Sequence, residues 1–325
     1  MGEIFVTRRI FPEAIATLED AGHEVAINDT STILSKAELI ERARGSDGLI
    51  CLLNDEIGAE LLDVCSDLRV VSNVAVGYDN IDVDAATERN VAVTNTPGVL
   101  TETTADLTFA LLMSAARRLP EADVYSRQDR YDGWELMQPH MGVDVYNKTL
   151  GIWGMGRIGR AVARRAHNGF DMDVIYNSQN RKLDIEAELD AEFVPFDELL
   201  ERSEFLSVHT PLTDETAGTF TTETLAQMRD DAVLINAARG PIVDEDDLAD
   251  ALEAGELLGA AIDTFEDEPR VNPRLAEIHE FVTLAPHIGS ASRETRLQMA
   301  QMAADNMIAG LGDSVPPNIV NEEVL

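Results

Sequence analysis

The feature that most constrains the fold is a repeated alternation of short apolar runs with segments of helical spacing. Segments such as "PEAIATLEDAG" separate apolar runs that predict strands, and strands alternating with helices pair in parallel through right-handed crossovers. The first part of the chain contains five such runs, at residues 3–7, 23–28, 48–53, 68–76 and 91–95. The pattern therefore predicts parallel sheets covered by helices.

This rhythm is interrupted once along the chain. It breaks at "NTPG" (95–98), resumes at "TLGIWGMG" (149–156) and continues to "FVTLAPHIGS" (281–290). A chain of 325 residues exceeds one ordinary hydrophobic core, so two domains are expected. We predict an α/β fold of two doubly wound parallel-sheet domains, a Rossmann cofactor domain and a smaller flavodoxin-like substrate domain.

The charge balance is strongly acidic, with 60 Asp and Glu against 25 Lys and Arg and a formal net charge of −35. There is no long acidic tail, so the carboxylates must cover the folded surface, where they repel one another unless salt screens them. We interpret this as adaptation to a halophilic host, with an acidic protein from an ordinary host as the alternative. The sign of the charge disfavours nucleic acid as a partner.

Membrane insertion and secretion are not indicated by the sequence. No apolar stretch approaches the ~20 residues that span a bilayer, and the N-terminus lacks the pattern of a signal peptide. Cys51 and Cys65 are the only cysteines, and the histidines show no metal-ligand spacing with them or with each other. We therefore expect a reduced, cytoplasmic protein with no membrane partner and no metal site.

The strongest local motif is "GIWGMGRIG", which places Gly154, Gly156 and Gly159 between an apolar strand and a helix. In G-x-G-x-x-G, the first glycine permits a tight turn, the second admits a pyrophosphate and the third allows close helix–strand packing. The N–H groups of Arg157 and Ile158 then face the phosphates at the positive end of the helix. A glycine-rich turn is the alternative interpretation, but this context favours dinucleotide binding.

The loop after the next strand indicates which dinucleotide binds. An NAD site typically has an acidic residue roughly 20 residues beyond the glycines, where it accepts from the ribose 2′-hydroxyl. Neutral side chains followed by cations suit a 2′-phosphate instead, so we favour NADP(H), with NAD(H) possible. An ordinary polar loop in a relaxed NAD site is the alternative. The residues concerned are Asn177, Ser178, Gln179, Asn180, Arg181 and Lys182.

Three later strands end in a guanidinium, a carboxylate and an imidazole, from Arg239, Glu268 and His287. Each residue alone has a non-functional interpretation: Arg239 as a surface cation, Glu268 as one acid among many and His287 as a buried core histidine. Open α/β sheets bind ligands at the carboxyl ends of their strands, so the three are expected to face one crevice. Together they suit a 2-keto acid. Arg239 would bind its carboxylate, and His287 would protonate the ketone while Glu268 orients it and raises its pKa.

Several motifs together resemble the D-isomer-specific 2-hydroxyacid dehydrogenases over nearly the whole chain. Besides the glycine motif, they are "VAVGYDNID" (74–82), "NTPG", "HTPLTDETAG" (209–218), "NAARG" (236–240), "DTFEDEP" (263–269) and "PHIGSAS" (286–292). The missing acid at Asn177 resembles the NADP-preferring glyoxylate and hydroxypyruvate reductases. The resemblance implies reversible hydride transfer between NAD(P)H and C2 of a small 2-keto acid.

The same resemblance assigns further residues and a domain order. It implies that Arg239, Glu268 and His287 are catalytic and that the backbone N–H groups of Val76 and Gly77 bind the substrate carboxylate. It implies a discontinuous substrate domain, residues 1–98 and 291–325, around a cofactor domain, residues 99–290. Four residues are implied around the cofactor: Thr210, Pro211, Ala237 and Asp263, with Asp263 near the nicotinamide.

Two points about partners stay open in the sequence. A catalytically silent cofactor-sensing protein of the same fold is the alternative to an enzyme, although the complete Arg–Glu–His set favours catalysis. The resemblance also implies a homodimer. The apolar helix expected at 101–119 and the segment containing Trp134 offer surface for it, unless they pack internally.

Overall fold

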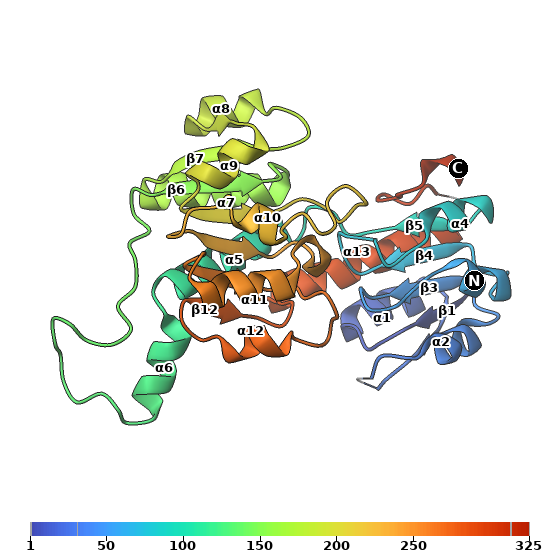
Figure 1. Cartoon of the computed structure of the whole chain (residues 1–325). Helices are drawn as coiled ribbons and strands as arrows, with labels where there is room; N and C mark the ends of the chain where they lie inside the picture. The colour runs from blue at the N-terminus through green and yellow to red at the C-terminus, as the bar shows by residue number, and fades with distance from the viewer. Residues whose placement is uncertain (1, 31, 313, 325) are drawn as a thin grey trace. The chain divides into compact units, whose positions relative to one another are not determined.

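The computed structural model describes residues 2–30, 32–312 and 314–324 (Figure 1). The chain forms two compact units, one made of Met1–Leu100 with Ser290–Leu325 and the other of Thr101–Gly289. These are called unit 1 and unit 2 below. Their bounds lie within two residues of the two ranges expected from the sequence.

Unit 1 contains a five-stranded parallel sheet in the order β2-β1-β3-β4-β5, the flavodoxin-like order. The long C-terminal helix α13 (Arg293–Leu311) packs against α1, β3 and β4, and Ser72 on β4 donates a 3.0 Å hydrogen bond to the Ala303 carbonyl. The strands are β1 (Glu3–Val6), β2 (Glu24–Ile27), β3 (Gly48–Cys51), β4 (Val70–Asn73) and β5 (Ala92–Thr94). The other helices are α1 (Pro12–Asp20), α2 (Lys36–Ala43), α3 (Ala59–Val64) and α4 (Val83–Glu88).

Unit 2 contains a seven-stranded parallel sheet in the order β12-β11-β10-β9-β6-β7-β8. The first six strands along the chain, β6 to β11, are arranged in the Rossmann order. The chain adds β7 and β8 on one side of β6 and then returns to add β9 on the other side. The strands are β6 (Thr149–Trp153), β7 (Asp173–Asn177), β8 (Glu192–Phe193), β9 (Phe205–Val208), β10 (Val233–Asn236), β11 (Gly259–Ile262) and β12 (Val282–Leu284). The α-helices are α5 (Thr101–Ala116), α6 (Leu119–Arg127), α7 (Arg157–Phe170), α8 (Leu183–Leu189), α9 (Phe196–Arg202), α10 (Thr222–Leu225), α11 (Glu245–Ala254) and α12 (Pro273–Glu277).

Local sequence explains how these elements begin and end. The central strands β9, β10 and β11 are buried at every residue, as expected for parallel strands covered on both faces. Helix α11 begins where the Asp244 carboxylate accepts from the N–H groups of Asp246 and Asp247. It ends at Gly255, which has a φ of 69° that glycine adopts without steric cost.

Two sequence expectations are corrected here. The single apolar helix expected at 101–119 is two helices, because Arg118 has a φ of 53° and α6 then begins with Pro120 in its first turn. Strands are also shorter than the apolar runs that predict them. The apolar run "EFVPF" (192–196), which predicts one of the strands between 149 and 290, forms only Glu192–Phe193, since Pro195 has no N–H to donate to a ladder.

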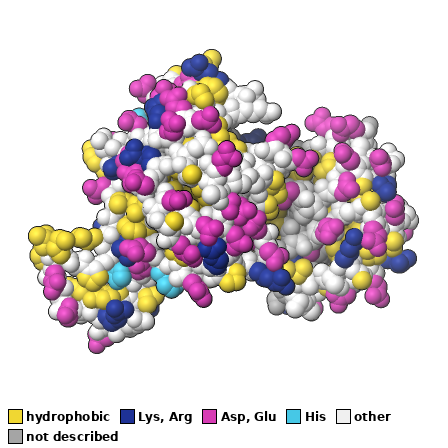
Figure 2. All heavy atoms as spheres, in the orientation of Figure 1, with side chains coloured by type: hydrophobic (Ala, Val, Ile, Leu, Met, Phe, Trp, Pro, Cys, Tyr) yellow, Lys and Arg dark blue, Asp and Glu magenta, His cyan; other side chains and the backbone are white. Residues whose placement is uncertain are grey.

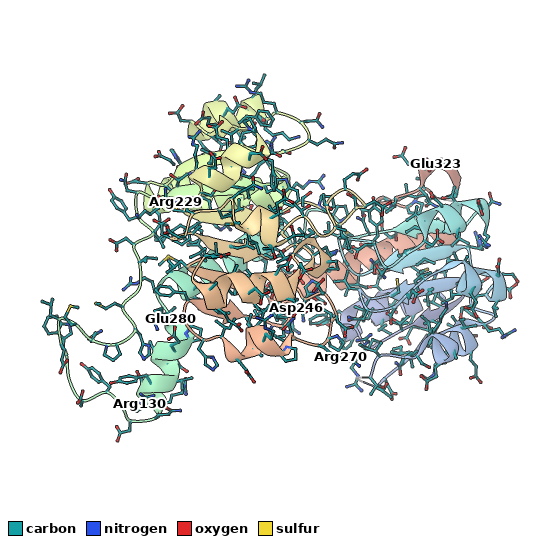
Figure 3. All side chains as sticks on the ribbon, in the orientation of Figure 1. Arg130, Arg229, Asp246, Arg270, Glu280 and Glu323 are labelled. Carbon is teal, nitrogen blue, oxygen red and sulfur yellow. The ribbon has the colours of Figure 1, made fainter. Side chains whose placement is uncertain are left out.

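Carboxylates are spread over the visible surface of the molecule (Figure 2). Arg229, Asp246 and Arg270, labelled in Figure 3, are exposed charged residues of unit 2. No helix within the described ranges is long and apolar enough to cross a membrane. The described residues also contain no cluster of His, Cys, Asp and Glu that could hold a metal ion.

Candidate active site

The sequence-predicted residues of unit 2 lie at the carboxyl edge of one sheet. Because β7, β6, β9, β10, β11 and β12 are consecutive neighbours in a parallel sheet, the residues that follow them lie along this same edge. In sheet order these residues are Asn177, Gly154, Thr210 with Pro211, Ala237 with Arg239, Asp263 with Glu268, and His287. The order in which the chain adds strands reverses beside Gly154, between β6 and β9, and such sheets bind nucleotides at this point.

The glycine turn has the geometry that a dinucleotide requires. Gly154 has a φ of 102°, and a side chain there would come within 2.6 Å of the His209 backbone, so only glycine fits. A side chain at Gly159 would lie 2.3 Å from the Gly154 carbonyl oxygen, whereas one at Gly156 would meet nothing within 4 Å. The turn thus leaves open space at Gly156, where helix α7 begins with Arg157 and Ile158. These features fit a pyrophosphate group at the helix N-terminus.

The loop after β7 is tied to this turn but is less positive than its sequence suggests. The Gly154 N–H donates to the Asn177 carbonyl at 2.9 Å, and the Asn177 side chain donates to the Val194 carbonyl at 2.9 Å. Arg181 does not stand alone, because the Glu186 carboxylate of α8 binds its Nε and Nη2 atoms at 2.8 Å each. The expectation of an acid-free basic patch is therefore wrong. A neighbouring helix supplies the acid that the loop lacks.

The arginines of helix α7 are paired in the same way. Arg164 binds Glu188, Arg160 binds Asp184, and Arg165 binds Asp106 and Glu102 of α5. Their charge is therefore largely balanced locally, whereas Arg157 is exposed at the first position of the helix.

The imidazole of His287 and the carboxylate of Glu268 form a hydrogen-bonded pair. The Nδ1 atom of His287 lies 2.9 Å from Oε2 and 3.1 Å from Oε1 of Glu268. The Phe265 N–H also donates to this carboxylate at 3.1 Å, which fixes its position. Burial raises the pKa of Glu268, but the hydrogen bond and positive charge of His287 outweigh it, so the pKa is lowered overall. Glu268 is thus an ionised acceptor that holds Nδ1–H and leaves Nε2 as the nitrogen able to exchange a proton with a ligand.

A second buried carboxylate, Asp263, holds the loop that carries His287. Its side chain accepts hydrogen bonds of 2.8 Å from the N–H groups of Ile288 and Gly289, and its carbonyl accepts one of 2.8 Å from the His287 N–H. His287 has a φ of 51°, an unfavourable conformation for a non-glycine residue. The three hydrogen bonds from the Asp263 backbone and side chain maintain it, and such maintained strain is typical of functional sites.

The backbone around Arg239 is fixed by one buried side chain and one glycine. Asn236 accepts from the Ala238 N–H at 3.1 Å and donates to the Arg239 carbonyl at 2.9 Å. A side chain at Gly240 would lie 2.0 Å from the Phe265 backbone, so the glycine lets this loop pack directly on the segment that leads to Glu268. The positive charge of Arg239 also contributes to lowering the pKa of Glu268.

His209, which follows β9, is not a proton donor at this edge. Burial lowers the pKa of His209 to about 3, so the ring stays neutral, and its Nε2 atom lies 2.8 Å from the Ser207 hydroxyl.

In unit 1, Val76 and Gly77 follow β4 in a loop held by asparagine side chains. Asn95 donates to the Val76 carbonyl at 2.7 Å, and Asn73 donates to the Gly77 carbonyl at 2.8 Å. With both carbonyls bound, the orientation of these peptide groups is set. Among the described residues, neither amide N–H of this pair has an acceptor. Two adjacent N–H groups of this kind fit a carboxylate.

Comparison with known proteins agrees with this geometry. Residues 109–289 match the family model for the NAD-binding domain of D-isomer-specific 2-hydroxyacid dehydrogenases. A glyoxylate reductase from Korarchaeum cryptofilum is 48% identical over 99% of this chain and 96% of its own length. The chain belongs to the D-isomer-specific 2-hydroxyacid dehydrogenase family. It is an NAD(P)-dependent oxidoreductase that interconverts 2-keto acids and 2-hydroxy acids.

Solved structures of this dehydrogenase fold cover nearly the whole chain. The TT0316 protein from Thermus thermophilus superposes with a TM-score of 0.91 at 41% identity, covering 98% of this chain and 99% of its own. An NADPH-dependent glyoxylate/hydroxypyruvate reductase from Sinorhizobium meliloti, solved with NADP and malonate, superposes with a TM-score of 0.87. It is 32% identical and covers 99% of this chain and 97% of its own.

Sequence reasoning missed the residues that position this dehydrogenase site. Asn236, Tyr176 and Glu186 were not singled out, and Asp263 was assigned only to the cofactor. Asn236 stands at the start of "NAARG", but its hydrogen bonds to the following loop depend on a turn that spacing does not reveal. Glu186 lies in the helix that directly follows the loop, but its separation of five residues from Arg181 does not mark a contact in the sequence.

Asp263 yields a prediction about stability. Burial, opposed by the N–H groups of Ile288 and Gly289, raises its pKa from 3.8 to about 6. The folded chain therefore holds this proton more tightly than the unfolded chain, and the resulting stability is full below pH ~4 and lost as pH rises through ~6. Asp263→Asn does not titrate. Its unfolding free energy relative to wild type should rise between pH 4 and 6 by at most about 3 kcal/mol.

Denaturant unfolding of both proteins at pH values from 4 to 8 measures this difference. A difference that stays constant across the range would show that Asp263 is not protonated near pH 6 in the folded chain.

Proposed function

We propose that this enzyme reduces glyoxylate and hydroxypyruvate with NADPH as the preferred cofactor. The His287–Glu268 pair carries the proposal, because a general acid held by a carboxylate at the same sheet edge as the glycine turn and Arg239 suits reduction of a small keto acid. The 48% identical glyoxylate reductase and the fold of the NADPH-dependent reductase support the substrate class. The open turn at Gly156 fits the cofactor pyrophosphate.

Each residue has a defined role in the proposed reaction. The reduced nicotinamide, when bound, supplies a hydride to C2 of the keto acid. His287 donates the proton from Nε2 to the ketone oxygen, while ionised Glu268 stabilises the ring through Nδ1. Arg239 pairs with the substrate carboxylate and stabilises the charge that develops on the oxygen. The N–H groups of Val76 and Gly77 in unit 1 keep the assignment to a substrate carboxylate that the family resemblance implies.

The remaining edge residues are assigned to the cofactor. Ile158 and Arg157 lie at the N-terminus of α7, where backbone N–H groups suit the phosphates. Asp263 is assigned to the nicotinamide end, since it lies next to the His287 loop. We assign Thr210, Pro211 and Ala237 to the groups between, and Asn177, Ser178, Gln179, Asn180 and Arg181 to the adenosine end.

Substrate and cofactor preference can be measured together. Oxidation of NADPH and of NADH should be followed with glyoxylate, hydroxypyruvate, pyruvate and a branched keto acid. We expect the highest kcat/KM for glyoxylate or hydroxypyruvate with NADPH, the substrates and cofactor for which the similar reductases are named. Tight NADPH binding without turnover of any keto acid would instead support a cofactor-sensing protein.

The proposed acid pair predicts a graded loss of activity. His287→Gln should lower kcat by about 10²–10⁴-fold, since a positioned proton donor contributes that much. Glu268→Gln should lower kcat less, because the ring remains but its orienting charge is lost. KM should change little in both variants if Arg239 binds the substrate. Steady-state kinetics test this, with Glu266→Gln as a nearby acidic control outside the pair. Equal activity of His287→Gln and wild type would contradict the assignment.

We also propose that the enzyme is a homodimer. An arm, defined as residues 128–141, follows α6, and its apolar side chains project into solvent (Figure 2). Trp134, Leu136 and Met137 are 74%, 78% and 75% exposed. So large an apolar exposure on one segment is typical of a protein–protein contact.

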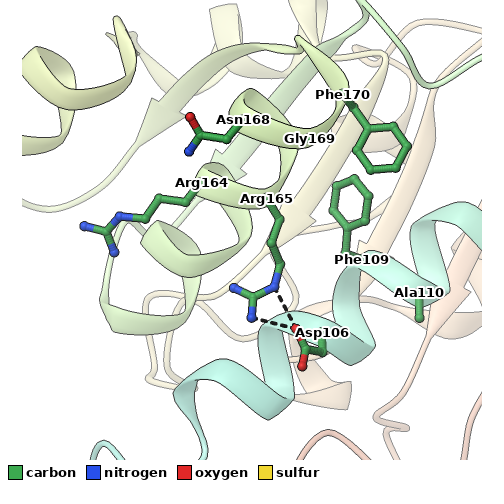
Figure 4. A pocket seen from close by; sticks show the side chains of 8 residues that line it. All are labelled: Asp106, Phe109, Ala110, Arg164, Arg165, Asn168, Gly169 and Phe170. Atoms are coloured by element: carbon green, nitrogen blue, oxygen red, sulfur yellow. Dashed lines mark hydrogen bonds and ion pairs between the residues drawn. The ribbon is translucent and has the colours of Figure 1, made fainter.

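A hollow of about 590 Å³ between α5 and α7 offers a matching surface on the same unit (Figure 4). The rings of Phe109 and Phe170 meet there at 4.7 Å between centroids. In a twofold dimer, the arm of each copy would cover the hollow of the other. The full lining is Asp106, Phe109, Ala110, Arg164, Arg165, Asn168, Gly169 and Phe170.

A charge placed on the arm should therefore separate the copies. Leu136→Glu should give a monomer in sedimentation velocity at micromolar concentration, because a carboxylate would be buried in the contact. Val315→Glu, at a side chain 59% exposed on unit 1, is the matched control and should leave the mass unchanged. A monomeric wild type, or a Leu136→Glu variant with wild-type mass, would contradict the dimer.

The acidic surface supports a further part of the proposal, a halophilic, cytoplasmic setting. In molar salt the screening length is about 3 Å, so repulsion among the surface carboxylates largely disappears. Cys51 and Cys65 are both buried free thiols, which suits a reducing compartment.

A further inference from the structure

Arg181, the cation assigned to the adenosine end, is held by Glu186 through one side of its guanidinium. Nε binds Oε1 and Nη2 binds Oε2, both at 2.8 Å, which is the bidentate side-on arrangement. The second proton of Nη2 and one proton of Nη1 form the end-on edge of the plane, which Glu186 does not occupy. The Arg181 side chain is 60% exposed, so this other edge is accessible to an anion.

The carboxylate of Glu186 is in turn held by a hydrogen bond from Tyr176. The Tyr176 hydroxyl donates to Oε1 of Glu186 at 2.7 Å and accepts from the Lys182 N–H at 2.6 Å. Tyr176 is fully buried, and burial raises the pKa of Tyr176 to about 12, so the hydroxyl keeps its proton and remains a donor. The Glu186 side chain, 15% exposed, therefore stays beside Arg181 whether or not a ligand is present.

We propose that Glu186 is a specificity-determining residue that limits how strongly this enzyme prefers a 2′-phosphorylated dinucleotide. The proposal rests on the proposed cofactor role of the loop after β7. Arg181 and Glu186 together carry no net charge, so a 2′-phosphate on the accessible edge of Arg181 is attracted by the guanidinium and repelled by the carboxylate. An unphosphorylated ribose is affected by neither.

Glu186 has two opposing effects, and their sizes decide the sign of the proposal. By orienting Arg181 it favours phosphate binding, but an exposed ion pair contributes little. Its repulsion acts on a group that carries nearly two negative charges within a few ångströms of Arg181, which is a larger effect at low salt. Glu186 should therefore weaken binding of the phosphorylated ligand. The weakening should fade in molar salt, where charges are screened over about 3 Å.

The test uses fragments that carry only the adenosine end, so it does not depend on catalysis. Adenosine 2′,5′-bisphosphate and adenosine 5′-monophosphate are titrated into the full chain by calorimetry at 0.1 M and at 2 M salt. Glu186→Gln keeps the side-chain shape and an acceptor for Tyr176. It should lower the Kd of the bisphosphate about three- to tenfold at 0.1 M salt, with a smaller gain at 2 M. The Kd of the monophosphate should stay within about twofold.

A matched control lies on the same helix. Glu188 of α8 binds Arg164 in the same bidentate way, at 2.6 and 2.9 Å, and Arg164 is outside the cofactor loop. Glu188→Gln removes the same charge and should leave the ratio of the two Kd values unchanged. In an Arg181→Ala background the bisphosphate should bind more weakly, and Glu186→Gln should still lower its Kd, since the carboxylate repels the phosphate directly.

The outcomes separate this inference from the proposed function. An unchanged or raised bisphosphate Kd in Glu186→Gln, or equal effects of both glutamine variants, would overturn the role of Glu186 while leaving the enzyme assignment intact. If wild type binds neither fragment nor NADPH, both the inference and the proposed cofactor are overturned. Thermal melts show whether Glu186→Gln is folded, and Glu186→Ala repeats the test if it is not.

Discussion

Parallel strand pairing is the constraint on which the catalytic unit depends. Because all strands of the larger sheet run in one direction, every loop that leaves a carboxyl end reaches the same edge. A glycine turn, a buried aspartate and a histidine from distant parts of the chain therefore lie along one edge, where the aspartate and the histidine loop are in direct contact. The side chains supply chemistry, but the sheet supplies their proximity.

Proximity alone does not give a proton donor in a usable orientation. Here two carboxylates orient His287: Glu268 binds its ring and Asp263 binds its backbone loop. Both carboxylates lose solvation because they are partly or wholly buried. The ionised form of Glu268 is stabilised by the charge and hydrogen bond of His287, whereas that of Asp263 is stabilised mainly by backbone N–H groups. At Asp263 these contacts do not offset the cost of burial, so its pKa is raised. At Glu268 they more than offset it, so its pKa is lowered. The unfavourable backbone of His287 persists because Asp263 binds three successive N–H groups of its loop.

The sequence allowed the architecture to be predicted because strand, helix and glycine signals are local. The two parallel-sheet domains follow from such patterns, and so does the contact between Glu268 and His287, whereas the catalytic role of Arg239, Glu268 and His287 stays a prediction. What escaped were contacts set by tertiary packing. Neither the carboxylate of Glu186 against Arg181 nor the amide of Asn177 against Val194 can be read from spacing, because each partner comes from another element. The prediction of one continuous helix at 101–119 was wrong for a local reason, because the backbone of Arg118 is left-handed.

These packing contacts determine how strongly the surface arginines can attract an anionic cofactor. With 60 acidic residues against 25 basic ones, a cation on this surface rarely lacks a carboxylate within reach. Arg160, Arg164 and Arg165 on α7 and Arg181 in the loop after β7 are all paired with carboxylates. Attraction of an anionic cofactor then depends less on the number of arginines than on which edge of each guanidinium its carboxylate leaves accessible. In so acidic a protein, the placement of acids is as much a part of cofactor selection as the placement of bases.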